Sequence, residues 1–111
     1  MRIAEVYMHG ILAGILSEVE KNSEYLFKYD SAYNGPPVSV TMPVNIGEFR
    51  FEQFPPFFEG LLPEGANLDM LLRSQKLDRD DLFGILLEVG GDTVGAVTVV
   101  EAQHETMPDH I

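Results

Sequence analysis

The chain has 111 residues, of which seven are Lys or Arg and 18 are Asp or Glu, so its formal net charge at pH 7 is −11. This length limits the chain to one compact domain and excludes a two-lobed enzyme. The charge argues against a nucleic-acid partner and an anionic membrane, because both are bound through Lys and Arg, and it favours a basic protein surface.

Cysteine is absent, which excludes disulfides, thiolate metal sites and thiol nucleophiles. The first ten residues, MRIAEVYMHG, hold no apolar stretch of signal-peptide length. No window contains the ~18 apolar residues that a membrane span needs. We therefore expect a cytoplasmic protein.

The N-terminal third predicts an antiparallel meander of three strands, over residues 2–8, 11–17 and 24–30. His9-Gly10 is a two-residue connection between the first two strands, with glycine where positive φ is needed. Residues 19–23 are expected to form a polar turn. In the third strand the aromatic residues Tyr25, Phe27 and Tyr29 fall on one face.

The next segment consists mostly of turn-forming residues, with Asn34-Gly35 and two prolines within residues 30–37. Short extended pieces are expected at residues 38–42 and 49–51. Because each is short and Pro43 follows the first, neither is expected to form a central strand.

Three short helices are then predicted, over residues 55–62, 66–76 and 79–89. Pro55 and Pro56 suit the start of the first helix, because a helix start needs no backbone N–H from proline. Gly90 is a natural end for the third helix.

The carboxylates around these helices are expected to have structural roles. Asp78 is expected to cap the third helix, with Asp80 and Asp81 in its first turn, where the helix dipole favours negative charge. Asp69 and Arg73 lie four residues apart and are expected to pair on the exposed side of the second helix.

Residues 93–100, TVGAVTVV, are β-branched and uncharged, which predicts a strand buried on both faces that returns to the sheet. Residues 101–111 are expected to form a flexible, polar, acidic tail. We therefore predict one α+β domain over residues 1–100, with a small antiparallel sheet (N-terminal meander plus C-terminal strand) packed with about three short helices.

No motif indicates catalysis, a metal or a cofactor. His9 falls in a turn, and His104 and His110 are six residues apart, which is not the spacing of a helical zinc site. The glycines of residues 90–95 follow a helix and precede a strand, the reverse of a phosphate-binding loop. We expect no catalytic, metal-binding or cofactor-binding residue.

The segment FPPFFEGLLPEG, residues 54–65, concentrates phenylalanine, leucine and proline. Its apolar side chains either attach the helices to the sheet or are partly exposed as a partner-binding surface. The two interpretations are compatible if Phe57 and Leu61 are buried and other residues of the segment face solvent.

Several segments together resemble the N-terminal subdomain of HipA-type toxin kinases: EVYMHGILAGIL, SVTMPV, FPPFFEGLLPEG and DLFGILLEVGGDTVGAVTVV. The resemblance covers residues 3–100. The kinase core that follows this subdomain in the family is not found in the 111 residues, so no kinase activity is expected of this chain.

A free-standing copy of this subdomain is similar to the HipS antitoxins of three-component HipBST systems. The resemblance implies a non-enzymatic antitoxin whose partner is a HipT-like serine/threonine kinase toxin. A HipB-like helix-turn-helix protein would join a ternary complex and make the nucleic-acid contact, which this chain would not make itself. The expected kinase contacts are Phe58, Leu62, Pro63, Glu64, Gly65, Ala66 and Asn67.

We attribute this role to the turn at residues 62–67 because proline stiffens it and so lowers the entropic cost of binding. Its Glu64 is suited to meet basic groups of the kinase. Two alternatives remain: an N-terminal fragment of a longer HipA-type kinase, and a small ligand-binding or hydrolytic domain.

Overall fold

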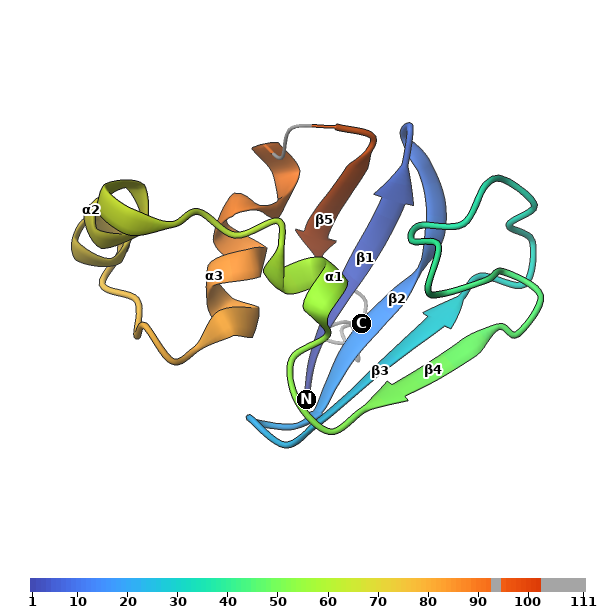
Figure 1. Cartoon of the computed structure of the whole chain (residues 1–111), viewed down its shortest axis with the longest axis horizontal. Helices are drawn as coiled ribbons and strands as arrows, with labels where there is room; N and C mark the ends of the chain where they lie inside the picture. The colour runs from blue at the N-terminus through green and yellow to red at the C-terminus, as the bar shows by residue number, and fades with distance from the viewer. Residues whose placement is uncertain (93–94, 103–111) are drawn as a thin grey trace, which may run out of the picture.

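The computed structural model describes residues 1–92 and 95–102 and contains one five-stranded antiparallel sheet of order β4-β3-β2-β1-β5 (Figure 1). The strands are β1 (Arg2–Met8), β2 (Ile11–Glu20), β3 (Glu24–Tyr29), β4 (Glu48–Phe51) and β5 (Val97–Glu101). The helices are α1 (Pro56–Glu59), α2 (Gly65–Gln75), α3 (Leu82–Val89) and the 3₁₀ turn η1 (Gly90–Asp92). The predicted α+β class with an antiparallel sheet is confirmed.

The core lies on one face of the sheet, because side chains along each strand alternate between the two faces. Tyr25, Phe27 and Tyr29 share the buried face, as predicted. The ring of Tyr25 stacks on Phe83 of α3 with centroids 6.3 Å apart, and Phe27 lies 5.8 Å from Phe58 of α1. Two helices therefore pack on the sheet through aromatic residues.

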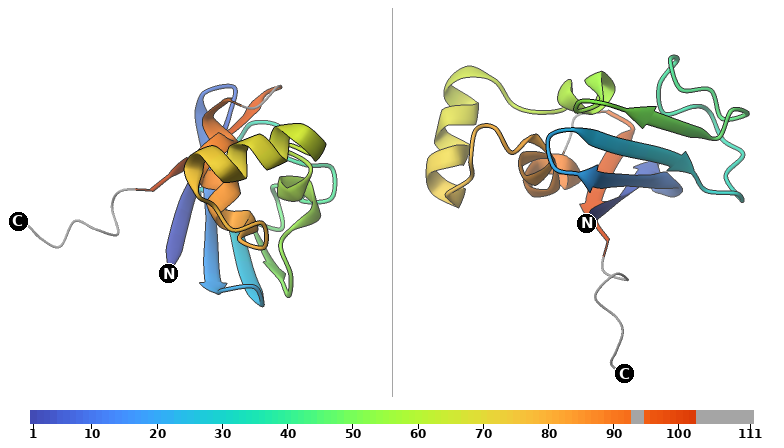
Figure 2. Two further views of the ribbon diagram at one scale, coloured as in Figure 1. Left: turned by 90° about the vertical axis from the view of Figure 1, so that its left-hand side faces the viewer. Right: turned by 90° about the horizontal axis from the view of Figure 1, so that it is seen from below.

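The third helix, α2, lies apart from this arrangement. Figure 2 shows it standing off the sheet, on the far side of α3. Two extended connections, one from α1 and one to α3, hold it there (Figure 1). The helical layer thus consists of α1 and α3 on the sheet, with α2 outside them.

Two predictions for the first half of the chain need correction. β2 continues to Glu20, so the turn is shorter than residues 19–23. Residues 38–42 form a tight turn with a single bridge between Ser39 and Met42, and not an extended piece. The Met42 N–H closes this turn by donating to the Ser39 carbonyl (2.9 Å). The Tyr29 hydroxyl holds both ends of the segment, because it donates to the Met42 carbonyl (2.5 Å) and accepts from the Val38 N–H (2.9 Å).

The helix boundaries also differ from the prediction. α1 ends at Glu59, because the chain turns at Gly60 before Pro63. α3 begins at Leu82 because Asp81 caps it, while the carboxylate of Asp78 accepts a hydrogen bond from the Asp80 N–H.

The expected pair within α2 is replaced by a longer-range contact. Asp69 pairs with Arg79, which lies in the connection to α3, and not with Arg73. A turn back toward the helix therefore brings Arg79 to Asp69.

The C-terminal strand does return to the sheet, where it pairs with β1. Its predicted burial on both faces is wrong, because β5 is an edge strand whose side chains alternate between buried and exposed. The N–H of Ala102 still donates to the Ile3 carbonyl, 2.9 Å away. Residues 93–94 of the predicted strand and residues 103–111 of the predicted tail lie outside the described residues.

Gly90 allows the end of α3 to approach β5, and its replacement tests this packing. A Cβ on Gly90 would lie 2.4 Å from the Val99 carbonyl oxygen. We expect Gly90→Ala to lower the free energy of unfolding by about 2 kcal/mol, because the strand backbone must shift. Urea denaturation provides the measurement.

The matched control is Gly91→Ala, since a Cβ there meets nothing within 4 Å. This variant should stay within about 0.5 kcal/mol of the wild type. Equal stabilities for the two variants would refute the close approach of α3 to β5.

Candidate functional site

The segment that attracted attention in the sequence folds as a short helix, a tight turn and the start of a second helix. After α1, the N–H groups of Leu61 and Leu62 donate to the Phe58 and Glu59 carbonyls, both at 3.1 Å. Gly65 then starts α2 with φ +61°, a value that residues with side chains rarely adopt. We call residues 60–64 the α1–α2 connection.

The structure brings most of the predicted contact residues to one surface around this connection. Leu62 and Pro63 are half-buried, whereas four further residues are exposed: Glu64, Gly65, Ala66 and Asn67.

Phe58 is different from the other predicted contact residues, because its ring is fully buried between Phe27 and Phe57. Its side chain belongs to the core and is not available to a partner in this conformation. The expected interior positions, Phe57 and Leu61, are half-buried.

A groove of about 230 Å³ lies beside the connection, and we call it the helical groove. Its lining comes from α1, the connection, α2 and α3, and consists of Glu59, Leu62, Pro63, Glu64, Gly65, Leu68, Leu82 and Ile85. These residues include no histidine, serine or threonine that could act as a base or nucleophile. The groove can hold an apolar or amphipathic side chain, with two carboxylates at its edge.

The neighbouring helix α2 offers an apolar side that the rest of the domain covers only in part. None of its residues is fully buried, and Leu68, Leu71 and Leu72 are half-buried. An 11-residue helix is marginal without tertiary packing, so this helix is suited to gain contacts from a partner.

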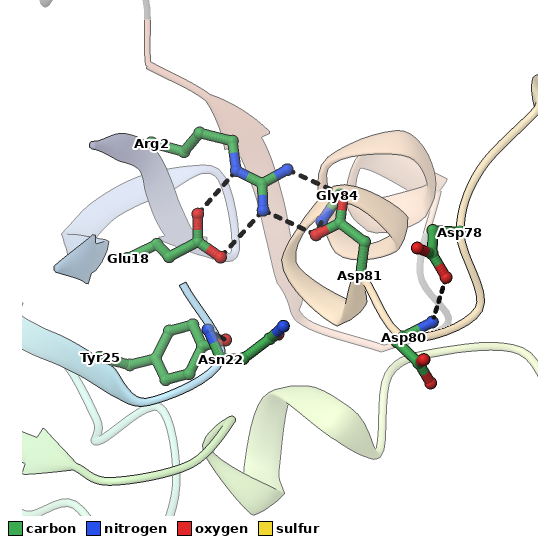
Figure 3. A network of polar contacts seen from close by, with 8 residues as sticks. All are labelled: Arg2, Glu18, Asn22, Tyr25, Asp78, Asp80, Asp81 and Gly84. Carbon is green, nitrogen blue, oxygen red and sulfur yellow. Dashed lines mark hydrogen bonds and ion pairs between the residues drawn. The ribbon is translucent and has the colours of Figure 1, made fainter. Parts of the chain in front are cut away.

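The wall that α3 contributes to the helical groove is fixed by a polar network around Arg2 (Figure 3). The guanidinium donates to Glu18 through Nε and Nη2, at 2.8 and 2.9 Å. It also donates to Asp81 through Nη2 and Nη1, at 2.6 and 3.1 Å. Asp81 in turn accepts a hydrogen bond from the Gly84 N–H at 3.2 Å, which caps α3. β1 and β2 thereby hold the start of this helix.

This network also shifts the pKa values of Asp81 and Arg2. The hydrogen bonds from Arg2 hold the pKa of the Asp81 carboxyl below its ordinary value of 3.8. The hydrogen bonds to Glu18 and Asp81 raise the pKa of Arg2, which stays protonated. The guanidinium carbon also lies 5.2 Å from the centre of the Phe83 ring, a cation–π distance.

Sequence reasoning missed four residues of the groove: Glu59, Leu68, Leu82 and Ile85. One signal was available, because Glu59 and Glu64 flank the apolar residues of the connection. No sequence pattern indicates that α3 faces this connection, because that contact depends on the tertiary fold.

Within residues 1–92 and 95–102, no group of three or more His, Asp or Glu side chains is placed to hold a metal ion. No helix in the same part of the chain has the length and apolar character to cross a membrane.

Comparison with protein families gives a match to the model described as HipA N-terminal domain, over residues 4–100. A solved structure entitled N-terminal domain of HipA toxin superimposes with a TM-score of 0.72 at 25 % identity, covering 93 % of this chain and 94 % of that one. The fold and nearly the whole sequence length therefore agree with this domain.

Curated relatives of two sizes are similar to the chain. An uncharacterized protein of Haemophilus influenzae is 31 % identical over 101 residues, which are 91 % of this chain and 93 % of that protein. The serine/threonine-protein kinase toxin HipA of Shewanella oneidensis is 30 % identical over 98 residues, which are 86 % of this chain. The chain spans 22 % of the length of that kinase toxin.

The Arg2 network predicts an unequal response to two Arg→Lys substitutions. Arg2→Lys keeps the charge but loses the planar guanidinium group that donates hydrogen bonds to two carboxylates. The free energy of unfolding should therefore fall by about 2 kcal/mol. The control Arg50→Lys affects an exposed pair with Glu24 and should cost less than about 0.5 kcal/mol. Urea denaturation of both variants measures the difference, and equal losses would contradict a special role for Arg2.

The lowered pKa of Asp81 predicts how the network responds to acid. A carboxyl whose pKa is lower in the folded state stabilises the fold above its ordinary pKa of 3.8, and this stabilisation is lost as the pH falls through the lower, folded value. The stability difference between wild type and Asp81→Asn should stay constant from about pH 7 to pH 5 and shrink below about pH 4. Asparagine caps helices as well as aspartate does, so the comparison isolates the charge. A difference that does not change with pH would contradict the Arg2–Asp81 ion pair.

Proposed function

The chain belongs to the HipA N-terminal domain family, and from that premise we propose that it is a non-enzymatic antitoxin that binds a HipT-like serine/threonine kinase toxin and holds it inactive. A cytoplasmic three-component system, with a HipB-like helix-turn-helix protein as DNA-binding member, is the setting we infer for it. The observation that carries this proposal is the surface formed by the α1–α2 connection, the helical groove and α2, whose apolar residues are partly uncovered.

The two sizes of relatives support the proposal that this domain acts on a kinase as a separate chain. The chain covers 93 % of the Haemophilus protein but 22 % of the Shewanella kinase toxin. A domain that accompanies a kinase in one protein has a surface suited to that kinase. As a separate chain it can bind the kinase and block it.

The physical chemistry of the surface fits protein binding. The backbone around Leu62 and Gly65 is fixed by the hydrogen bonds of α1 and by the helix start, so little conformational entropy is lost on binding. The net charge of −11 increases the rate of encounter with a basic kinase face. Uncovered apolar residues next to exposed carboxylates supply affinity and orientation, respectively.

A second candidate function is that of the N-terminal domain within a longer HipA-type kinase. The observation that favours it is the 22 % coverage of the Shewanella kinase toxin. The gene sequence decides between the two: a kinase core in the same reading frame supports the longer protein, and a kinase in a separate frame supports the antitoxin.

The antitoxin proposal predicts which substitutions release the kinase. Glu64→Lys and Leu62→Asp should weaken inhibition of a HipT-like kinase partner by at least about tenfold, because Glu64→Lys reverses a charge and Leu62→Asp places a charge on an apolar contact. Growth on co-expression and phosphorylation assays with purified proteins measure the effect. Glu64 is exposed, so its variant should keep the wild-type stability.

Val40→Asp is the matched control, since Val40 is 91 % exposed on the loop between β3 and β4, far from α2 in Figure 1. It should inhibit like the wild type. Full inhibition by folded Glu64→Lys and Leu62→Asp would show that the site is assigned wrongly.

A further inference from the structure

The two carboxylates at the edge of the helical groove differ from two other acidic groups near the helices. Asp81 and Asp69 are engaged by Arg2 and Arg79, respectively. Glu59 and Glu64 are exposed, and within the described part of the chain no ion pair or side-chain hydrogen bond engages either of them. Their charges are therefore available to a partner.

The rest of the groove lining is apolar. Leu62, Leu68 and Leu82 line it, together with Ile85, which is 1 % exposed and lies at its base. Its volume of about 230 Å³ is smaller than the ~300–1,000 Å³ of typical small-molecule pockets. A space of this size is suited to one long side chain of a partner.

We propose that the helical groove receives an arginine side chain of the partner. The aliphatic stem packs on the leucines of the groove, and the guanidinium lies between Glu59 and Glu64. Arginine fits because it joins an apolar stem to five donors that can reach two separate carboxylates. This inference rests on the proposed function, since it names the chemistry by which the kinase is recognised at the same surface.

The electrostatics favour a cation here although α2 begins at the groove. A helix N-terminus carries a partial charge of roughly +0.5, which alone would favour an anion. Glu59 and Glu64 each contribute a full negative charge, and their sum exceeds the helix charge severalfold. The net charge of −11 on the whole chain also favours a cation.

The test is an NMR titration of the ¹⁵N-labelled full chain with short peptides, which needs no kinase. The first peptide carries one arginine between leucine and glycine. The second replaces arginine with citrulline, which has the same shape without the charge, and a third carries lysine. We expect the arginine peptide to shift the amide signals of Gly65, Leu68, Leu82 and Ile85, and to bind about fivefold more tightly than the citrulline peptide at low salt.

A pair of variants separates the local carboxylates from the overall charge. Glu59→Gln with Glu64→Gln should reduce binding of the arginine peptide about fivefold. Glu20→Gln with Glu88→Gln removes the same total charge at exposed positions outside the groove and should leave binding unchanged. Both double variants should keep wild-type thermal stability.

The inference is overturned if the arginine peptide shifts nothing at ~10 mM, or binds no better than the citrulline peptide. It is also overturned if lysine binds more tightly than arginine, or if both double variants bind equally. Peptide binding in the groove without kinase inhibition would refute the proposed function alone. Kinase inhibition without a preference for arginine would refute this inference alone.

Discussion

One side chain, Arg2, holds together the parts of the domain that create the helical groove. The sheet gives α3 an apolar platform, but apolar contacts alone do not fix where a helix starts. Arg2 does so by donating to Glu18 on β2 and to Asp81, the cap of α3. The start of α3 in turn places Leu82 and Ile85 opposite the α1–α2 connection. The helical groove therefore depends on an ion pair between residues 79 positions apart in the chain.

The sequence was sufficient where a local pattern controls the structure. The period-two pattern of β3 identified its buried aromatic face, and the limits of β1 agree with the prediction. Predictions were wrong at two segments that a distant side chain contacts. The Tyr29 hydroxyl bonds to both ends of residues 38–42, which form a turn, and Arg2 engages Asp81, which caps α3 in place of Asp78. The candidate surface was found in part, because the proline- and leucine-rich connection is conspicuous. The α3 side of the groove and the burial of Phe58 depend on packing that no sequence pattern specifies.

The three helices contribute unequally to the core of the domain. α1 and α3 complete the core through Phe58 and Phe83. α2 contributes no fully buried residue and leaves its leucines half-covered. Substitutions at the exposed residues of α2 should therefore cost the fold little stability. The family relationship, which extends to a kinase toxin, is the reason why we propose a kinase as the partner of this surface.

Hydrogen exchange of the backbone, measured with and without a HipT-like kinase, tests most directly whether the α1–α2 connection and α2 form the contact surface. Our account predicts that complex formation protects the segment from Glu59 to Leu72, which contains the α1–α2 connection and most of α2, while the loop around Val40 exchanges at an unchanged rate. Protection at the Val40 loop or on the open face of the sheet, with none between Glu59 and Leu72, would contradict the account, as would the absence of any complex.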